Sequence, residues 1–571
     1  MDNAASQSTQ AIDRRSFMAY FSSIGLGATA LPTMLWEQQQ QEGPITVDTL
    51  VDAEAMIGLE FTDEERELMV SGLNSNLRRY QALREAAITN DVVPAIRFDP
   101  MLPGHSLPQP ISSVPRRTRP GTVTRPTRLE DVAFWPLVDL AELIRTRQVT
   151  SVELTEMYIA RLNRYGTTLE CLITITEDLA LRQARRADAE MKRGLYRGPL
   201  HGIAWGAKDL LAEDEYKTTW GARPYEDQHL DYDATVVQRL EEAGAVLMAK
   251  LTLGALAQGD VWFGGRTRNP WNTEQGSSGS SAGPASATVA GLVGFSIGSE
   301  TLGSIVSPST RCGATGLRPT FGRVSRAGAM ALSWSMDKLG PICRTVEDCA
   351  LVLEAIYGPD GQDPTVVETP FVWDASVPLT SLRIGYLKTA FEDTEANTHE
   401  FDAPAPDVLR RLGADLIPIE MPSDLPISAM RIILTAEAGA AFDDLTRSGR
   451  DDMLVRQSQR AWPTTFRVAR MIPAVEYIQA NRVRTMLMGE MEAALAGIDV
   501  FITPSYANNV LLITNLTGHP AVTLPNGFQE NGSPVSVSFI GRLFAEDRLL
   551  VAAKAYQDAT GFHAKHPPAF R

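Results

Sequence analysis

The sequence predicts an α/β fold in which a large mixed sheet is covered by helices on both faces and is preceded by a helical N-terminal appendage. Short apolar runs lie between segments with helical periodicity, which is typical of strands that alternate with helices. These runs are 200–208, 245–249, 382–386 and 500–503. The chain has 571 residues, of which 44% are hydrophobic and 21% are charged, so it is long enough to bury a large core.

The appendage and a following linker are predicted over residues 42–126. Thr62, followed three residues later by Glu65, is typical of a helix start, and apolar residues then recur at the spacing of one helical face. They are Leu68, Met69, Leu73, Leu77, Tyr80 and Leu83. We therefore expect helix over most of 47–90. Residues 91–126 are rich in proline and are predicted to run along the surface as an extended linker.

The main domain is predicted over residues 127–571. It should open with helices over 137–146 and 151–165, and residues 428–490 should be mostly helical. Three aromatic residues in that helical region either line a substrate pocket or pack in the core. They are Trp462, Phe466 and Tyr477.

The first 41 residues resemble a twin-arginine export signal. Arg14 and Arg15 precede an uncharged, moderately apolar stretch over 16–36, and the small residues at 28–30 offer a cleavage site. That stretch is too short and too rich in small residues for a membrane span, so we expect no integral membrane span after processing. The prediction is a periplasmic or cell-envelope protein of a bacterium. The alternative is an N-terminal tail that happens to contain two arginines.

The charge balance limits the partners. The chain has 53 Lys and Arg against 69 Asp and Glu, a net charge of −16, so it has no electrostatic reason to bind nucleic acid or an anionic membrane. Four cysteines in such a length do not form a disulfide framework and are expected to be buried thiols. The expected partner is a small molecule, and a homodimer is left open.

Residues 276–322 have the glycine and serine content of a linker, but apolar runs at 289–293 and 295–297 interrupt them. This combination predicts a buried segment. Small buried residues let backbones approach closely and leave amide groups free to face a ligand, as an oxyanion site requires. The alternative is a tightly packed helix and turn without chemistry.

Three phrases in this region resemble the amidase signature family of serine hydrolases. They are GSSAG at 279–283, TLGSI at 301–305 and CGATGLRPT at 312–320, and Lys208 precedes them in the phrase GPLHGIAWGAKDLL. The resemblance covers roughly residues 129–562. It implies the family's α/β fold and hydrolysis of amide bonds without cofactor or metal.

The resemblance also assigns roles residue by residue. It implies a catalytic triad of Lys208, Ser280 and the nucleophile Ser304, with a cis peptide bond between Gly279 and Ser280. Ser281 and Gly279 would support the triad. The backbone N–H groups of the oxyanion hole would belong to Thr301, Leu302, Gly303 and Ser304.

Amide chemistry requires such a set independently of the family. An amide is a poor electrophile with a poor leaving group, so its hydrolysis needs an activated nucleophile, a proton for the departing nitrogen and stabilisation of an oxyanion. Lys208 can be the base only when neutral, and its apolar neighbours in 203–207 would lower its pKa. Ser280 would relay the proton between Lys208 and Ser304.

The chain departs from the family pattern around the nucleophile. The family usually has Gly-Gly before the serine, Asp two residues before that pair and Arg two residues after the serine. Here these positions hold Leu302, Glu300 and Val306. Leu302 still offers an amide and Glu300 keeps the negative charge, but Val306 removes the arginine. Pocket details from other members therefore do not transfer directly.

Other motifs suggest different chemistry. GSSAG also matches a nucleophile elbow, which would make Ser281 the nucleophile, but that motif needs a preceding strand and residues 269–276 are not predicted as one. Residues 335–338 match the S-x-x-K pattern of β-lactamase-like proteins, without a following K-T-G. Seven dispersed histidines predict no metal site.

The predicted function is hydrolysis of carbon–nitrogen bonds other than peptide bonds, through an acyl-enzyme on Ser304. The alternative is a glutaminase component similar to the A subunit of glutamyl-tRNA(Gln) amidotransferase, which delivers ammonia to a partner. A catalytically inactive scaffold is disfavoured because Lys208, Ser280 and Ser304 are all present.

Overall fold

The structure is a computed structural model that describes residues 44–85 and 89–571. The chain separates into two compact units, Met1–Thr89 and Asn90–Arg571. The predicted export signal at 1–41 lies outside the described residues. The second unit begins at Asn90, so it includes the proline-rich segment that the sequence predicts to be a linker ending at residue 126. None of the described helices is long and apolar enough to cross a membrane.

The first unit contains two helices within the range 47–90 that the sequence predicts to be mostly helical. They are α3 (Val47–Ile57) and α4 (Asp63–Arg84). The break lies at Gly58, whose left-handed backbone (φ 68°) closes α3. Helix α4 starts as predicted, because the Thr62 side chain accepts from the Glu65 N–H and the Glu65 carboxylate accepts from the Thr62 N–H. The apolar periodicity marks a partly buried face only in part: Met69, Leu73 and Leu77 are half-buried, whereas Leu68 is 83% exposed.

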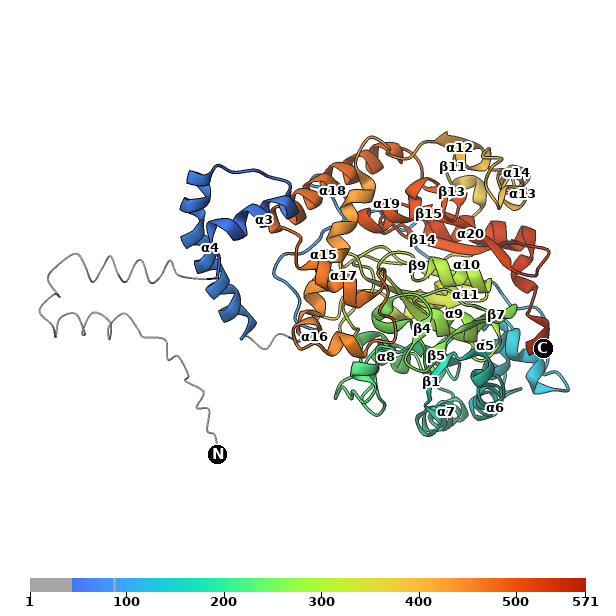
Figure 1. Ribbon diagram of the computed structural model, residues 1–571. Coiled ribbons are helices and arrows are strands. Elements are labelled where there is room, and N and C mark those ends of the chain that lie inside the picture. The colour runs from blue at the N-terminus through green and yellow to red at the C-terminus, as the bar shows by residue number, and fades with distance from the viewer. Residues whose placement is uncertain (1–43, 86–88) are drawn as a thin grey trace, which may run out of the picture. The chain divides into compact units, whose positions relative to one another are not determined.

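The second unit is built on an eleven-stranded sheet in the order β1-β3-β2-β8-β10-β9-β14-β15-β13-β11-β12 (Figure 1). The sheet is mixed, because β2 is parallel to β3 and β8, whereas β10 is antiparallel to β8 and β9. Its strands are β1 (Leu172–Ile175), β2 (Ala204–Lys208), β3 (Val246–Leu251), β8 (Phe295–Glu300), β9 (Thr315–Arg318), β10 (Lys338–Cys343), β11 (Ile384–Leu387), β12 (Leu416–Ile419), β13 (Val500–Pro504), β14 (Ala521–Phe528) and β15 (Pro534–Gly541). Two small ribbons pair β4 (Val261–Trp262) with β5 (Gly265–Arg266) and β6 (Arg268–Asn269) with β7 (Asn272–Gly276).

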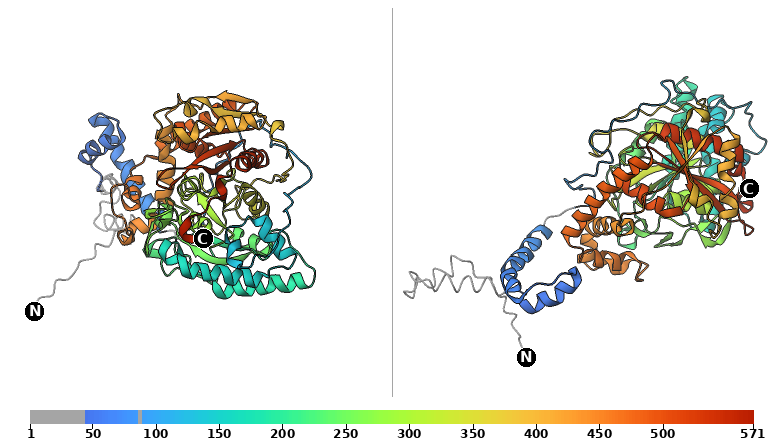
Figure 2. Two further views of the ribbon diagram at one scale, coloured as in Figure 1. Left: turned by 90° about the vertical axis from the view of Figure 1, so that its right-hand side faces the viewer. Right: turned by 90° about the horizontal axis from the view of Figure 1, so that it is seen from above.

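Helices cover both faces of this sheet, as predicted (Figure 2). Helices α9 and α10 pack on each other and on central strands, and α11 and α20 form a second such pair. The helices are α5 (Leu137–Arg145), α6 (Ser151–Leu169), α7 (Glu177–Lys192), α8 (Thr235–Glu242), α9 (Ala282–Val289), α10 (Val306–Cys312), α11 (Val346–Ile356), α12 (Lys388–Phe391), α13 (His399–Asp402), α14 (Ala405–Arg411), α15 (Arg431–Ala441), α16 (Asp443–Arg447), α17 (Trp462–Ala469), α18 (Ala474–Ala494), α19 (Val510–Thr517) and α20 (Glu546–Thr560).

The four predicted strands are present, with their ends shifted by a few residues. All residues of β2, β3 and β13 are buried, which explains their continuous apolar runs, because helices cover a central strand on both sides. All four cysteines are buried free thiols, as expected. Trp462 and Phe466 stack in the core, with ring centroids 5.0 Å apart, rather than forming a pocket wall.

The proline-rich segment is attached to the second unit by its backbone. The N–H of Ile111 donates to Asp547 (2.6 Å), that of Thr118 donates to Glu347 (2.7 Å), and that of Arg116 donates to the carbonyl of Trp373 (2.9 Å). These bonds tie the extended segment to helices α11 and α20 and to the loop before β11.

Candidate active site

The sheet topology gathers the candidate residues at one edge. Strands β2 and β8 are parallel neighbours, so their carboxyl ends, at Lys208 and Glu300, lie at the same edge. Strand β10 runs the opposite way and starts there, with Lys338 opposite Glu300. The pairing of β2, β8 and β10 therefore places Lys208, Glu300 and Lys338 beside the glycine- and serine-rich segment.

Lys208 is fully buried among hydroxyl groups. Its Nζ lies 2.8 Å from Ser280 Oγ, 2.8 Å from Ser299 Oγ and 3.1 Å from Ser281 Oγ. Within the described part of the chain it forms no ion pair. Burial lowers the pKa of the Lys208 ammonium well below its ordinary value, although the more distant carboxylates of Asp337 and Glu300 act in the opposite direction.

Ser280 follows a cis peptide bond from Gly279, as the resemblance implied. Gly279 cannot carry a side chain here, because an added Cβ would lie 1.9 Å from the carbonyl oxygen of Gly259. Ser281 is bound on all sides: its hydroxyl contacts Lys208 and donates to the Ser299 carbonyl at 3.0 Å, and it accepts the Ser299 N–H at 3.1 Å. These contacts fit the supporting role predicted for Gly279 and Ser281.

Ser304 lies in the loop that joins β8 to α10. The Ser304 carbonyl accepts the N–H of Ser281 at 3.1 Å, which holds this loop against the Gly279–Ser281 segment. The Ser304 side chain is 8% exposed, and its hydroxyl has no hydrogen-bond partner among the residues that the structure describes. The structure thus brings the Ser304 loop beside Ser280 and Ser281 and leaves its hydroxyl uncommitted.

The backbone N–H groups of this loop also lack hydrogen-bond acceptors in the described part of the chain. Among residues 44–85 and 89–571 we find no acceptor for the backbone N–H groups of Thr301, Leu302, Gly303 and Ser304. Gly303 has the left-handed φ of 87° that glycine tolerates best, and its carbonyl accepts the Ser307 N–H at 2.7 Å. A run of free backbone N–H groups in a turn forms an anion-binding concavity. This is the group of donors that an oxyanion requires.

The Glu300 side chain holds the loop between β8 and α10 in place. Its Oε2 accepts the N–H groups of Ile305 (2.8 Å) and Val306 (3.0 Å), and its Oε1 pairs with Arg318 (2.7 Å). Burial would raise the pKa of Glu300, but Arg318, Lys338 and the backbone bonds lower it to about 2. The carboxylate is therefore charged over the whole working range of pH, and Arg318 neutralises it within the core.

The sequence did not identify several residues of this network. Ser299 contacts Lys208, Thr301 donates to Asp337 at 2.6 Å, and Asn515 joins Glu300 to Lys338 by bonds of 2.8 and 2.7 Å. Arg318 appears in the sequence only as one letter of a family phrase. The partners come from separate segments of the chain, so local patterns give no indication of the pairing.

The two competing motifs have other roles. The prediction that no strand precedes GSSAG was wrong, because β7 ends at Gly276; β7 nevertheless belongs to a two-stranded ribbon and not to the main sheet. In the S-x-x-K pattern, Ser335 Oγ donates to Glu437 (2.7 Å) while Lys338 Nζ donates to Asn515 (2.7 Å). The serine and the lysine of that pattern thus bind different partners.

Among the described residues, one cluster of three acidic side chains has oxygens close enough to share a cation. Glu213, Asp214 and Glu215 place one oxygen each within 4.8 Å of one another, in the loop after β2. Glu215 is paired with Arg182. The described hydrogen bonds of Lys208 go to Ser280, Ser281 and Ser299 and not to these three residues.

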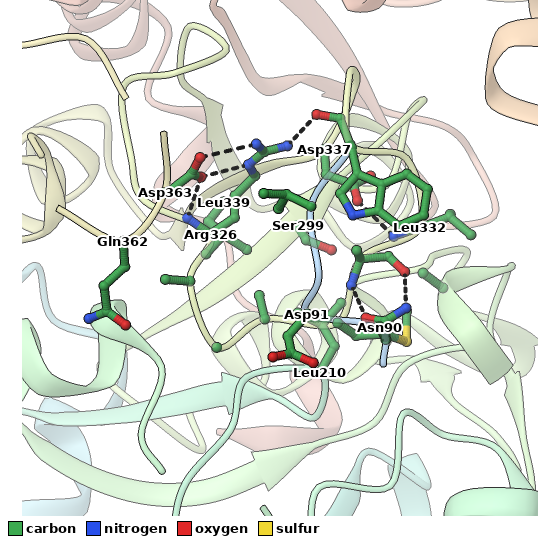
Figure 3. A pocket seen from close by; sticks show the side chains of 18 of the residues that line it. Asn90, Asp91, Leu210, Ser299, Arg326, Leu332, Asp337, Leu339, Gln362 and Asp363 are labelled. Carbon is green, nitrogen blue, oxygen red and sulfur yellow. Dashed lines mark hydrogen bonds and ion pairs between the residues drawn. The ribbon is translucent and has the colours of Figure 1, made fainter. Parts of the chain in front are cut away.

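A cavity of about 330 Å³ adjoins the Lys208 network. Ser299 and Thr301 line it from the end of β8, and Leu210 lines it from the segment after β2 (Figure 3). Further lining comes from residues 326–332 and Trp334, and from Asn90, Asp91 and Val93. The cavity therefore touches both the partner of Lys208 and the first residue of the loop with free amides.

Comparison with known proteins identifies the family. The family model named Amidase matches residues 153–513. The A subunit of glutamyl-tRNA(Gln) amidotransferase from Methylococcus capsulatus is 35% identical over 477 residues, which are 76% of this chain and 98% of that protein. The native peptide amidase from Stenotrophomonas maltophilia has a TM-score of 0.69 at 30% identity, over 77% of this chain and 99% of that chain. An amidase family protein from Bacillus anthracis has a TM-score of 0.69 at 25% identity, over 77% and 93% of the two chains.

The family match spans more than half of the chain and contains the strands of the main sheet from β1 to β13 in chain order, together with the segments that carry Lys208, Ser280 and Ser304. The chain therefore belongs to the amidase signature family of enzymes, which act on carbon–nitrogen bonds.

Proposed function

We propose that this enzyme hydrolyses small-molecule amides through an acyl-enzyme on Ser304, with Ser280 and Lys208 as its proton path. The observation that carries the proposal is the 2.8 Å contact between Lys208 Nζ and Ser280 Oγ, in a buried site where no described carboxylate is paired to the lysine. Such a lysine can be neutral near physiological pH and can accept a proton.

The reaction begins with attack by the Ser304 oxygen on the amide carbonyl carbon. A new C–O bond forms as the Ser304 proton passes to Ser280 Oγ and the Ser280 proton passes to Lys208 Nζ. The neutral Nζ receives it through the lone pair that faces Ser280, while its own N–H groups keep Ser281 and Ser299 as acceptors. The carbonyl oxygen becomes an oxyanion.

The free amides at 301–304 are the donors for that oxyanion. Their positions are fixed before substrate arrives, because the Glu300 carboxylate accepts the N–H groups of Ile305 and Val306 and so holds the end of the loop. Preorganised donors of this kind typically contribute a factor of about 10²–10³ in rate for each bond. Leu302, a departure from the family pattern, leaves this set intact because only its N–H is used.

The tetrahedral intermediate then collapses. The C–N bond breaks, and the proton held by Lys208 returns through Ser280 to the departing nitrogen, which leaves as a neutral amine or as ammonia. Water repeats the sequence on the Ser304 ester, releases the carboxylic acid and restores the hydroxyl. The cycle consumes one water molecule and is balanced without a redox partner.

A second candidate is a component that releases ammonia from glutamine for a partner protein. The similarity to the A subunit of glutamyl-tRNA(Gln) amidotransferase, over 98% of that protein, favours it. The similarity to a peptide amidase and the export-like N-terminus favour the independent hydrolase.

An assay of the purified chain without partners separates the two candidates. Aryl, fatty-acyl and amino-acid amides are each incubated with the enzyme, and free amine and free ammonia are measured, with Ser304→Ala as the control for background hydrolysis. We expect turnover of at least one amide class by the isolated chain. Ammonia release from glutamine alone, stimulated by added tRNA amidotransferase partners, would favour the second candidate.

A further inference from the structure

The cavity beside the Lys208 network has a wall that comes from outside the matched family region. The family match covers 153–513, whereas Asn90, Asp91 and Val93 line the cavity from the start of the second unit. We call residues 90–93 the strap. The lining of this cavity is therefore partly a property of this chain's own N-terminal extension.

The strap is anchored where it meets the cavity. Asn90 Nδ2 donates to the carbonyl of Ala331 (2.9 Å), and the Ala331 N–H donates to Asn90 Oδ1 (2.7 Å), so the side-chain amide pairs with the backbone as a strand would (Figure 3). A third contact joins Asn90 Nδ2 to the carbonyl of Ala441 at 3.4 Å. These bonds hold the next residue, Asp91, at the cavity.

The charges that line the cavity are unbalanced. Among the described residues, Arg326 is its one cationic lining residue, and Asp363 neutralises it at 2.9 Å while the Trp334 carbonyl accepts a further bond (Figure 3). The Asp337 carboxylate is occupied by Thr301 and by two backbone N–H groups. Asp91 and Asp233 remain, and neither forms an ion pair with any residue that the structure describes. Asp233 accepts one backbone N–H, from Asp214 at 3.0 Å, which fixes its carboxylate without neutralising it.

The remaining lining suits a substrate group that consists of an aliphatic stem with a cation at its end. Apolar side chains, including Leu210, Met330 and Leu339, line the cavity near the end of β8. Tyr232 also lines the cavity and directly precedes Asp233 in the chain. An aliphatic stem would bury apolar surface, and a protonated amine at its end would meet two carboxylates and an aromatic ring.

We propose that this cavity is a subsite for a positively charged, lysine-like group of the amide substrate, with Asp91 and Asp233 as its counter-charges. The inference rests on the proposed amidase function and names its substrate class. The strap supplies one of the two carboxylates, and the loop before α8 supplies the other.

The test compares two amides that differ only in the cation. N-acetyl-lysine p-nitroanilide and N-acetyl-norleucine p-nitroanilide have nearly the same length and apolar area, and the measured quantity is the ratio of their kcat/KM values. We expect the wild type to favour the lysine compound. Asp91→Asn and Asp233→Asn should each lower the ratio by about three- to tenfold, as expected for partly solvated charge pairs.

Asp415→Asn is the matched control. It removes the same charge from an exposed residue that does not line the cavity, so it should leave the ratio at the wild-type value. Asp91 is itself exposed, so its substitution is not expected to disturb folding, and the thermal unfolding midpoints of all variants are measured to establish this.

Binding to Ser304→Ala, measured by calorimetry with the same two compounds, keeps the two proposals separate. Tighter binding of the lysine compound, weakened when Asp91→Asn or Asp233→Asn is added, supports the subsite even if neither anilide is hydrolysed. Equal binding, or a preference that both substitutions leave unchanged, overturns the subsite. Hydrolysis of both anilides at equal rates would overturn it while leaving the amidase proposal intact.

Discussion

A buried lysine surrounded by three hydroxyl groups is the distinctive residue of this site. Lys208 would be strongly disfavoured as an ammonium there, because burial removes water and no carboxylate is paired with it in the described part of the chain. A serine nucleophile needs a base that is neutral when substrate binds. The same burial that makes Lys208 an unfavourable cation therefore makes it a usable base.

Lys208→Ala should lower kcat/KM by about 10²–10⁴-fold, the usual contribution of general-base catalysis. Because burial lowers the pKa of Lys208, the neutral base is populated below the ordinary lysine range, and wild-type kcat/KM should rise with pH along a single ionisation. That rise should disappear in Lys208→Ala. Lys192→Ala, an exposed control, should keep both rate and profile; an unchanged acidic limb in Lys208→Ala would exclude Lys208 as the base.

Glu300 supports the loop electrostatically, and its substitution should show as lost stability. Glu300→Gln leaves Arg318 buried without its counter-charge, which typically costs about 3–5 kcal/mol. The folded-state pKa of about 2 lies below the unfolded value of 4.5, so this stabilisation is present above pH 4.5 and is lost as pH falls toward 2. Asp407→Asn, in an exposed pair with Arg410, should change the unfolding midpoint little. Equal midpoints for the two variants would contradict this account.

At the scale of elements, the segment before α9 leaves no room for a larger residue at Gly279. Gly279 has no space for a methyl group beside Gly259, so Gly279→Ala must displace the backbone that positions Ser280. We expect strong loss of activity and of thermal stability. Gly489 in α18 has no atom within 4 Å of an added Cβ, and Gly489→Ala should stabilise by about 0.5–1 kcal/mol. Thermal unfolding of both variants checks this, and a stable, active Gly279→Ala would contradict it.

The sequence predicts site residues that stand in local motifs, but it does not predict contacts between segments that are distant along the chain. Lys208, Ser280 and Ser304 stand in family phrases, and Thr62 marks the start of its own helix. Asn515 and Asp337 reach the site only because β8, β10 and α19 are neighbours in space, which no short pattern records. The end of α3 at Gly58 is not predicted, although Thr62 marks the start of a new helix four residues later. Strand β7 is not predicted because its residues are polar and it belongs to a separate two-stranded ribbon.

For the whole molecule, we propose that the N-terminal segment directs export and that catalysis belongs to the second unit. A chain without residues 1–30 should fold and keep wild-type kcat/KM, because the described bonds around Lys208 come from residues beyond 200. In bacteria, replacing Arg14 and Arg15 by lysine should retain the full chain in the cytoplasm, as measured by fractionation. An insoluble truncated chain would mean that the segment is structural, and unchanged periplasmic yield of the double variant would contradict twin-arginine export.

The most direct test of the mechanism is to find the residue that becomes covalently modified. The enzyme is treated with a fluorophosphonate, and the adduct is located by mass spectrometry of its peptides. We predict a single adduct on Ser304, absent from Ser304→Ala, formed more slowly in Ser280→Ala and retained in Ser281→Ala. An adduct on Ser281 that persists in Ser304→Ala would contradict the assignment of Ser304 as the nucleophile.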